Sequence, residues 1–340
     1  MSNINTNTNT TSPYDLQELQ FESTLGGMGI ENDALQIPLI DLSNFSERRA
    51  EITEQLWAAA TQVGFFQLQH HGLDLTLIES TFAQAKAFFE LPNADKKAYP
   101  LKEGLNAGWE FMEQVRPSTG TADQKESYQV TLPHMDNLWP QELPMFHSII
   151  LEFEKRAWQL GMDVLSCFAD KLGFERDFFS RVHKRESAQY QSTLRLLHYL
   201  PMKDSLHQEG IWRAGAHTDF DCLTMVFQKD GQGGLQVCGG KTATEQQAWS
   251  NVIPRTDIIT CNIGDMLMRW SDDQLKSTLH RVRMPQAHEY QGPRYSLAFF
   301  CQANKDVIIQ GPQKKYEPIS AADFLRKRIN ANFAEIQEKK

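Results

Sequence analysis

Two histidines and one aspartate have the types and spacing of a metal site. His217-Thr218-Asp219 sets an imidazole and a carboxylate two residues apart, and such residues point to the same face of a strand. On its own, this pair also fits a strand histidine hydrogen-bonded to a loop aspartate. His280, in a later strand-like run, can supply a second imidazole. Two histidines and one carboxylate leave coordination positions open, as in the facial triad of non-haem Fe(II) sites. We therefore predict Fe(II) at His217, Asp219 and His280, with O2 and a cosubstrate at the open positions.

An arginine and a serine further along could bind a carboxylate. Arg294 and Ser296 share a strand face by the same two-residue period. A guanidinium can form two parallel hydrogen bonds with a carboxylate, and a hydroxyl can add a third. A lone strand arginine is usually solvated or part of a structural ion pair. Inside a metal-lined barrel, however, Arg294 and Ser296 are expected to anchor a dicarboxylate.

The predicted secondary structure around these residues changes from helical to strand-like near residue 193. Before it, apolar residues recur at helical spacing over 75–89 and 145–172, and Gly173 ends the second helix. After it, short strand-like runs alternate with turns. These runs cover 194–200, 223–228, 235–238, 257–262, 266–270, 279–282 and 294–302, whereas 101–140 is expected to be a long loop region with irregular strands. Many short strands predict a mainly β fold with flanking helices, built as a sandwich, a barrel or a jelly roll rather than from βαβ units. A last helix should start near Ser320, capped by Ser320 and Asp323.

Composition limits the class of protein. The 340 residues include 34 Lys and Arg against 43 Asp and Glu, a net charge of −9, which argues against a nucleic-acid-binding face. No apolar stretch is long enough for a membrane helix, and the Asn- and Thr-rich start lacks the features of a signal peptide. Five cysteines without CxxC spacing predict buried free thiols. We expect a cytoplasmic protein, and its oligomeric state stays open.

Taken in order, the motifs resemble the isopenicillin N synthase-like family of Fe(II)/2-oxoglutarate-dependent oxygenases over about residues 36–305. The residue at position 70, His70, stands where that family usually has asparagine. The matching segments are Ile37–Leu42, Gly64-Phe65-Phe66 with His71-Gly72, Asp123-Gln124-Lys125-Glu126, Gly215–Asp219 with Leu223-Thr224, Gly233–Val237, Asn262–Asp265, Ser277–Val282 and Arg294–Ser296.

The resemblance implies a double-stranded β-helix, or jelly-roll, core wrapped by helices. It also implies iron on His217, Asp219 and His280, and 2-oxoglutarate on Arg294 and Ser296, with Tyr199 helping to hold this cosubstrate. The expected division is an irregular tail at 1–35, a helix-rich N-terminal part at 36–190, the iron-bearing β-helix at 191–305 and a C-terminal helix at 306–340. The activity implied is oxidation, most simply hydroxylation, of a small molecule with release of succinate and CO2.

The substrate is not readable from the sequence. Residues in the loop region or beside the metal motifs are expected to border its pocket, and Arg116 could meet a substrate carboxylate. These residues are Trp109, Phe111, Arg116, Phe220, Trp270, Phe300 and Gln302. Alternatives are a 2-oxoglutarate-independent oxidative cyclase of the isopenicillin N synthase type, an ethylene-forming enzyme, and a non-catalytic protein on the same scaffold. The presence of all three ligand types argues against the last.

Overall fold

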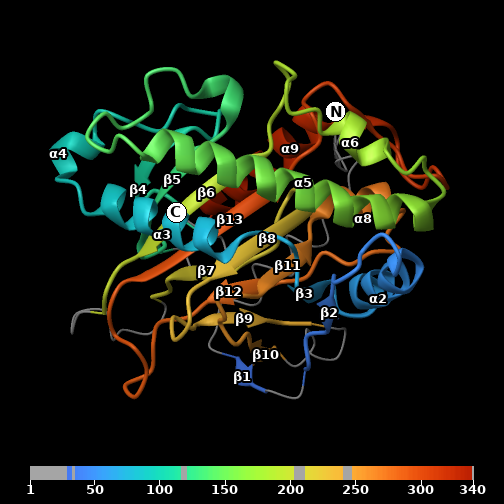
Figure 1. Cartoon of the computed structure of the whole chain (residues 1–340), viewed down its shortest axis with the longest axis horizontal. Helices are drawn as coiled ribbons and strands as arrows, with labels where there is room; N and C mark the ends of the chain where they lie inside the picture. Colours follow the sequence, from blue (N-terminus) through green and yellow to red (C-terminus); the bar gives the residue numbers. More distant parts are fainter. Residues whose placement is uncertain (1–28, 33–34, 116–120, 203–210, 240–246, 339–340) are drawn as a thin grey trace, which may run out of the picture.

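Two β-sheets face each other in the computed structural model, which describes residues 29–32, 35–115, 121–202, 211–239 and 247–338 (Figure 1). Arg116 and most of the predicted tail at 1–35 lie outside the described residues. Within them, the larger sheet has eight strands in the order β2 (Leu39–Asp41), β3 (Phe65–Gln69), β11 (Ile259–Ile263), β8 (Leu223–Gln228), β13 (Arg294–Cys301), β6 (Thr193–Tyr199), β5 (Lys125–Val130) and β4 (Gly108–Phe111).

The smaller sheet lies beneath the larger one in Figure 1 and carries both predicted histidine ligands. Its order is β1 (Ile30–Glu31), β10 (Ala248–Asn251), β9 (Leu235–Val237), β12 (His280–Val282) and β7 (Ala214–His217). A separate short pair joins β14 (Ile308–Ile309) and β15 (Ile319–Ser320). The predicted jelly-roll, mainly β with flanking helices, is therefore confirmed.

Helices cover the outer face of the larger sheet. Helix α5 runs across it and contacts β13 and β8, while α3 contacts β13 and β6. Apolar residues at helical spacing explain α5, and Gly173 ends it with a positive φ of 77°. The helices are α2 (Arg49–Gln62), α3 (Leu75–Phe89), α4 (Asn93–Lys96), η1 (Leu132–His134), α5 (Phe146–Leu172), α6 (Phe178–Val182), α8 (Asp265–Trp270) and α9 (Ala321–Glu338).

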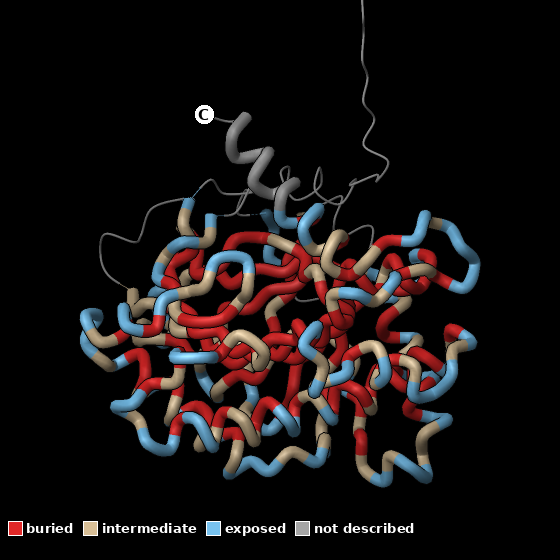
Figure 2. The backbone as a smooth tube through the Cα atoms, turned by 90° about the horizontal axis from the view of Figure 1, so that it is seen from above, coloured by how far each residue is buried: buried red, intermediate tan, exposed pale blue. Residues whose placement is uncertain are grey.

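Strand β13 separates two environments because its side chains alternate between the two faces of the sheet. Its odd-numbered residues, including Leu297 and Phe299, belong to the large apolar core under the helices. Its even-numbered residues point into the space between the sheets, where Ala298 and Phe300 pack with Tyr199. Figure 2 shows the buried chain concentrated in the middle of the molecule. The functional residues must therefore come from the inward-facing set.

The predicted strand at 266–270 is wrong, because this segment forms helix α8. The turn that starts α8 is tightly packed: a Cβ atom on Gly264 would lie 2.2 Å from the backbone oxygen of Asp221. The nitrogens of Asp265 and Met266 also bond to the oxygens of Asp219 and Asp221. These contacts set the direction of the chain, which a short apolar run cannot reveal.

The region 101–140 is also more regular than expected, since it supplies β4 and the fully buried β5. The last helix does begin after Ser320, whose hydroxyl accepts a hydrogen bond from the nitrogen of Asp323. All five cysteines lie within the described residues and are buried free thiols.

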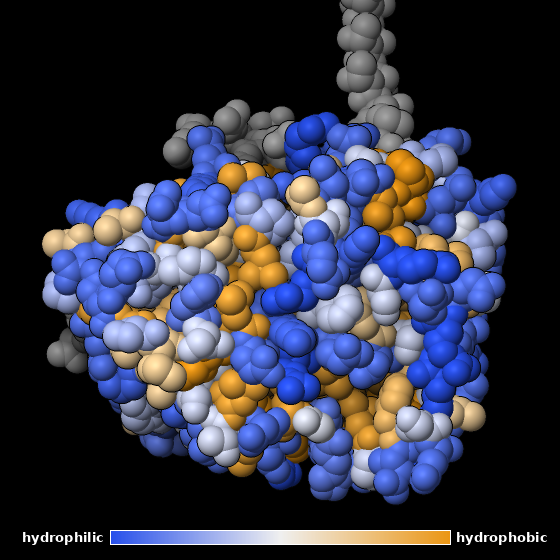
Figure 3. Space-filling view, turned by 45° about the horizontal axis from the view of Figure 1, so that its top comes forward, coloured by the Kyte–Doolittle hydropathy of each residue, from blue (hydrophilic) through white to orange (hydrophobic). Residues whose placement is uncertain are grey.

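Hydrophilic and hydrophobic side chains are interspersed on the face drawn in Figure 3. Among the described residues, no helix combines the length and the hydrophobicity that crossing a bilayer requires.

Candidate active site

The structure brings the three predicted metal ligands together. His217 ends β7 and lies directly opposite His280, the first residue of β12, with 4.3 Å between the ring centroids. Asp219 reaches the same point from the loop that follows β7. Its two carboxylate oxygens lie 3.9 Å from Nε2 of His217 and 3.6 Å from Nε2 of His280. One ligand atom from each residue falls within 4.8 Å of the others, a spacing that one ion could bridge.

Backbone carbonyls orient both imidazole rings. Nδ1 of His217 lies 2.7 Å from the oxygen of Gly215, and Nδ1 of His280 lies 3.3 Å from the oxygen of Thr278. An Nδ1–H that donates to a carbonyl fixes the tautomer and leaves Nε2 with a free lone pair. Both Nε2 atoms are the ones that face Asp219, so the donor set fits a divalent metal ion.

Two neighbouring strands hold the carboxylate of Asp219. Thr224 on β8 donates its hydroxyl to Oδ2 over 2.6 Å, and Asn262 on β11 donates its amide over 2.8 Å. These two residues are direct partners across the β8–β11 ladder. The arrangement fixes the carboxylate while Oδ1 still points toward His217. Neither Thr224 nor Asn262 was predicted as a site residue, although both lie in the matched motifs.

Two further buried acids lie close by and have other roles. Burial, and then the charge of Asp219, raise the pKa of Asp221 well above its usual value, so this carboxyl tends to be neutral. Asp265 forms an ion pair with Arg328 of α9 and accepts a hydrogen bond from the Thr218 hydroxyl over 3.2 Å. Asp265 thus ties the C-terminal helix to the loop that carries the metal ligands.

Arg294 is buried among neutral partners. It is 1% exposed, and its Nε donates to the carbonyl of Gln232 over 3.0 Å. Its two terminal nitrogens donate to Gln228 over 3.0 Å and to Ser296 over 3.3 Å, and its Cζ lies 4.7 Å from the ring centre of Tyr199. No carboxylate pairs with it among the described residues. Burial lowers the pKa of Arg294 for this reason, and an anionic ligand would relieve the cost.

A second buried arginine, which was not predicted as a site residue, lies nearby. Arg213 precedes β7 and is 2% exposed. Burial, together with the positive charge of Arg294, lowers the pKa of Arg213 to about 10. The sequence feature that could have indicated Arg213 is its position, four residues before the metal ligand His217.

Three of the predicted pocket residues lie elsewhere. In the β4–β5 ladder, Trp109 pairs with Tyr128 and Phe111 pairs with Glu126, which places both on the face of the sheet turned away from the triad. The indole nitrogen of Trp109 donates to Glu126 over 2.7 Å. Trp270, which is 1% exposed, packs in the helix-side core against the rings of α6. Trp109, Phe111 and Trp270 therefore lie away from the triad, which argues against the prediction that they border the substrate.

The remaining candidates lie nearer the triad. Phe300 faces the space between the sheets, with the guanidinium carbon of Arg195 5.0 Å above its ring. Phe220 directly follows Asp219 and lies under Arg328 at 4.9 Å. Gln302 is buried, and its Oε1 has no hydrogen-bond partner within the part of the chain that the structure describes. The register also adds Arg195, because it faces inward with Tyr199.

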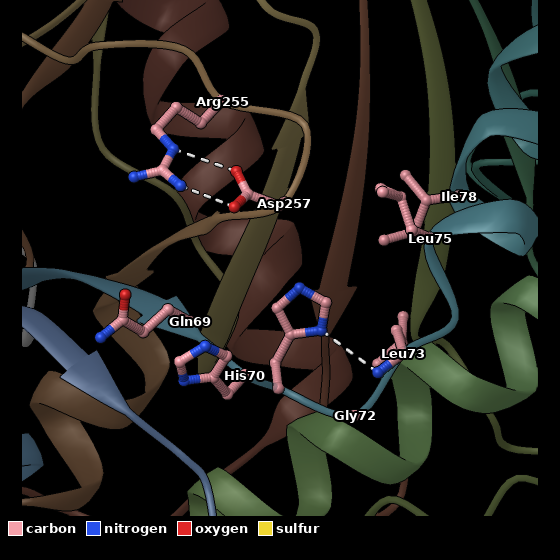
Figure 4. Close-up of a pocket in the computed structure, with 9 residues that line it drawn as sticks. Gln69, His70, Gly72, Leu73, Leu75, Ile78, Arg255 and Asp257 are labelled. Atoms are coloured by element: carbon pink, nitrogen blue, oxygen red, sulfur yellow. Dashed lines mark hydrogen bonds and ion pairs between the residues drawn. The ribbon is translucent and has the colours of Figure 1, made fainter.

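A separate cavity of about 230 Å³ opens at the far end of β3 (Figure 4). His70, Gly72 and the Arg255–Asp257 ion pair are among the residues that line it. Asp257 precedes β11, whereas Asn262 near its other end contacts the triad, so roughly 16 Å of strand separates the two places. This cavity is not the metal site.

Comparison with known proteins gives two family matches along the chain. Residues 37–142 match the N-terminal region described as non-haem dioxygenase in morphine synthesis. Residues 190–303 match the 2OG-Fe(II) oxygenase superfamily. The second match contains all three clustered ligands and Arg294.

Curated relatives and solved structures agree with these matches. A 2-oxoglutarate-Fe(II) type oxidoreductase of Emericella nidulans is 30% identical over 321 residues, covering 85% of this chain and 88% of the relative. A proline hydroxylase of Petromyces alliaceus is 30% identical over 300 residues, covering 81% and 90%. A solved structure of a Neurospora crassa protein in complex with alpha-KG and thymine has a TM-score of 0.77 at 30% identity, covering 89% of this chain and 98% of that one.

Proposed function

Because the chain belongs to the 2OG-Fe(II) oxygenase superfamily, it is an Fe(II)- and 2-oxoglutarate-dependent dioxygenase, and we propose that it hydroxylates a small molecule. In this proposal His217, Asp219 and His280 hold the iron. Arg294 anchors the far carboxylate of 2-oxoglutarate, with Ser296 and Tyr199 beside it. Bound iron would supply O2 activation coupled to decarboxylation of 2-oxoglutarate, with release of succinate and CO2.

The residues around the triad prepare it for this role. The carbonyls of Gly215 and Thr278 keep Nε2 of each histidine available, and Thr224 and Asn262 hold the Asp219 carboxylate in place. A fixed donor set lowers the cost of ordering the ligands when the metal binds. Three protein ligands leave positions for the cosubstrate and O2.

The observation that carries the proposal is the burial of Arg294, which has no anionic partner among the residues that the structure describes. A buried guanidinium with only neutral hydrogen-bond partners is costly, and a carboxylate ligand would offset that cost. The far carboxylate of 2-oxoglutarate meets this requirement, and Ser296 can add a hydroxyl contact.

We propose that the substrate is small and carries an N–H or O–H group. Phe300 and Phe220 would provide apolar contact near the triad. The Oε1 of Gln302, which has no hydrogen-bond partner within the described segments, would accept a hydrogen bond. The relatives named above support this class, since one is a proline hydroxylase and the structure of another contains thymine.

The cytoplasm is the proposed location. Buried free thiols and an Fe(II) site both suit a reducing compartment. The division of the chain into an N-terminal part at 36–190 and a core at 191–305 also stays a proposal.

The test is titration of the anaerobic Fe(II) protein with 2-oxoglutarate, following the metal-to-ligand charge-transfer band. Arg294→Leu should bind 2-oxoglutarate at least about a hundredfold more weakly, because the cosubstrate carboxylate loses its buried partner. Iron content should be unchanged, since the triad is untouched. Equal affinity in the variant would overturn the anchor assignment.

A second measurement identifies the reaction. Succinate release is screened over small amine, amide and heterocyclic compounds, and the products are analysed for added oxygen. Hydroxylated product supports the proposal. Ethylene from 2-oxoglutarate, or a desaturated or cyclised product without added oxygen, would contradict hydroxylation while leaving the family assignment intact.

A further inference from the structure

A second buried guanidinium shares the end of the barrel that holds Arg294. Nη2 of Arg213 donates to the carbonyl oxygen of Gly292 over 2.9 Å, and Gly292 is two residues before Arg294 in the chain. Arg213 is 2% exposed, and its Nε has no hydrogen-bond partner among the described residues. The side chain is therefore desolvated but only partly satisfied.

The charges at this end are not balanced. Within the described part of the chain, neither Arg213 nor Arg294 forms an ion pair. The carboxylate of Glu289 raises the pKa of Arg213, but its two oxygens are already 2.6 Å from the terminal nitrogens of Arg283. Burial lowers the pKa of Arg213, and repulsion by the positive charge of Arg294 lowers it further. An anion between the two guanidinium groups would offset both effects.

The neighbours of Arg213 indicate which way it points. The guanidinium carbon of Arg281 lies 4.5 Å from the ring centre of Trp212. Arg281 follows His280, so it faces away from the triad on β12. Trp212 therefore occupies the outer face of the smaller sheet, whereas Ala214 packs with Tyr199 and Val282 on the inner side. Arg213 lies in the bend between them, and its hydrogen bond to Gly292 and the effects of Arg294 and Tyr199 on its pKa place its guanidinium on the side where Arg294 lies.

We propose that Arg213 is a second cation for the distal carboxylate of 2-oxoglutarate, which is then held by a pair of arginines. This inference rests on the proposed function and deepens it. Arg294 contributes one guanidinium from the larger sheet, and Arg213 contributes another from the edge of the smaller sheet. The cosubstrate carboxylate thus links the two sheets at the end of the barrel away from His217.

The test compares the affinities of Arg213→Met and wild type for 2-oxoglutarate, measured on the anaerobic Fe(II) protein by the charge-transfer band. The variant should bind at least about tenfold more weakly, the typical effect of losing a hydrogen bond to a charged group. In turnover assays, the KM for 2-oxoglutarate should rise while kcat at saturation changes little. Arg213→Lys keeps the charge and should recover part of the affinity.

A second ligand separates binding from general damage. 2-Oxopentanoate has the same chain length as 2-oxoglutarate but ends in a methyl group. Arg213→Met should lower the ratio of the two affinities by about tenfold, because only the dicarboxylate loses a contact. A purely structural defect would weaken both ligands equally and would overturn the proposal.

Arg281→Met is the matched control. Arg281 is also buried and stacks on Trp212, but it lies on the outer face. Its variant should lose stability and keep the affinity ratio of wild type. If Arg213→Met binds 2-oxoglutarate like wild type, or affects only the primary substrate, the inference is wrong and the proposed function stands. If wild type itself shows no band at millimolar 2-oxoglutarate, both fail together.

Discussion

At the scale of single residues, the metal ligands were predictable because the signal is local. His217 and Asp219 are two positions apart, and the structure joins them to His280 through one strand pair. The pocket residues were harder, since Trp109 and Phe111 depend on the register between β4 and β5, which no local pattern fixes. His70, which stands where the family usually has asparagine, has a φ of 50°. This left-handed backbone conformation is one that asparagine adopts readily, which explains the family's usual residue at this position.

Thr224 tests how much the support of Asp219 matters. Thr224→Val removes the 2.6 Å hydrogen bond and keeps the shape of the side chain. We expect Fe(II) or Mn(II) affinity to fall by about 10–100-fold, as for other residues that orient a metal ligand. Calorimetric titration with the metal measures this affinity in the variant and in wild type.

Thr260→Val is the control for that variant. Thr260 is also buried on the inner face of the larger sheet, but its hydroxyl accepts hydrogen bonds from the side-chain amides of Gln67 and Gln228. Equal metal affinity in the two variants would show that the hydrogen bond to Asp219 has no role in binding.

His183 should make the protein sensitive to acid. Complete burial lowers its pKa from the ordinary 6.5 to about 4, and its Nδ1 lies 2.8 Å from the oxygen of Phe179. Between these values the unfolded chain binds a proton that the folded chain does not, so stability falls as the pH falls. The loss is on the order of 3 kcal/mol by pH 4.

Urea unfolding between pH 7.5 and pH 4.5 measures this effect. His183→Asn should flatten the dependence over that range, even if it is less stable at pH 7.5. His147→Asn, at an exposed position of α5, should leave the curve unchanged. A wild-type slope retained in His183→Asn would assign the acid sensitivity to other groups.

At the scale of elements, α5 and β13 follow from their own periodicity, whereas α8 and β5 do not. The 266–270 run is too short for its period to separate helix from strand. The turn at Gly264, which packs against Asp221, directs the following segment into a helix. Region 101–140 reads as loop because of its glycines and prolines, yet pairing with β6 makes β5 a fully buried strand.

Helix α9 is expected to support the metal loop through one buried ion pair. Arg328 is 2% exposed, pairs with Asp265 and donates to the Thr218 hydroxyl over 3.2 Å. Arg328→Gln would leave Asp265 buried without its cation, which typically costs about 3–5 kcal/mol. Thermal unfolding should show this loss, and metal affinity should fall because Thr218 lies between two ligands.

Arg326 provides the comparison on the same helix. It pairs with Asp323 at the surface, where an ion pair is worth about 0–1 kcal/mol, so Arg326→Gln should be nearly neutral. The double variant Asp265→Asn, Arg328→Gln should regain part of the loss. Unchanged stability in Arg328→Gln would mean that α9 does not support the loop.

At the scale of the whole molecule, the mainly β class could be predicted from the many short strands and the few amphipathic helices, whereas the jelly-roll arrangement was implied by the family resemblance. The sequence did not reveal that four strands of the N-terminal half join the larger sheet, because their place depends on long-range pairing such as that of β3 with β11. The free thiols were expected from cysteine count and spacing alone.

Those thiols predict that the fold does not need an oxidising environment. All five cysteines are buried and unbridged, so dithiothreitol should leave the unfolding temperature unchanged. In denaturant without reductant, a thiol reagent should label five groups per chain, and in the native state it should react slowly. Fewer than five labels would reveal a disulfide and contradict the expectation.

The alternation along β13 has a consequence for directed evolution. Residues 295, 297, 299 and 301 stabilise the helix-side core, whereas 294, 296, 298 and 300 face the space between the sheets, where the substrate is proposed to bind. A mutant library limited to Ala298 and Phe300 could therefore explore new substrates with little loss of folded protein. A library that also varied Leu297 and Phe299 would lose many members to misfolding, although these positions are the nearest neighbours in the chain.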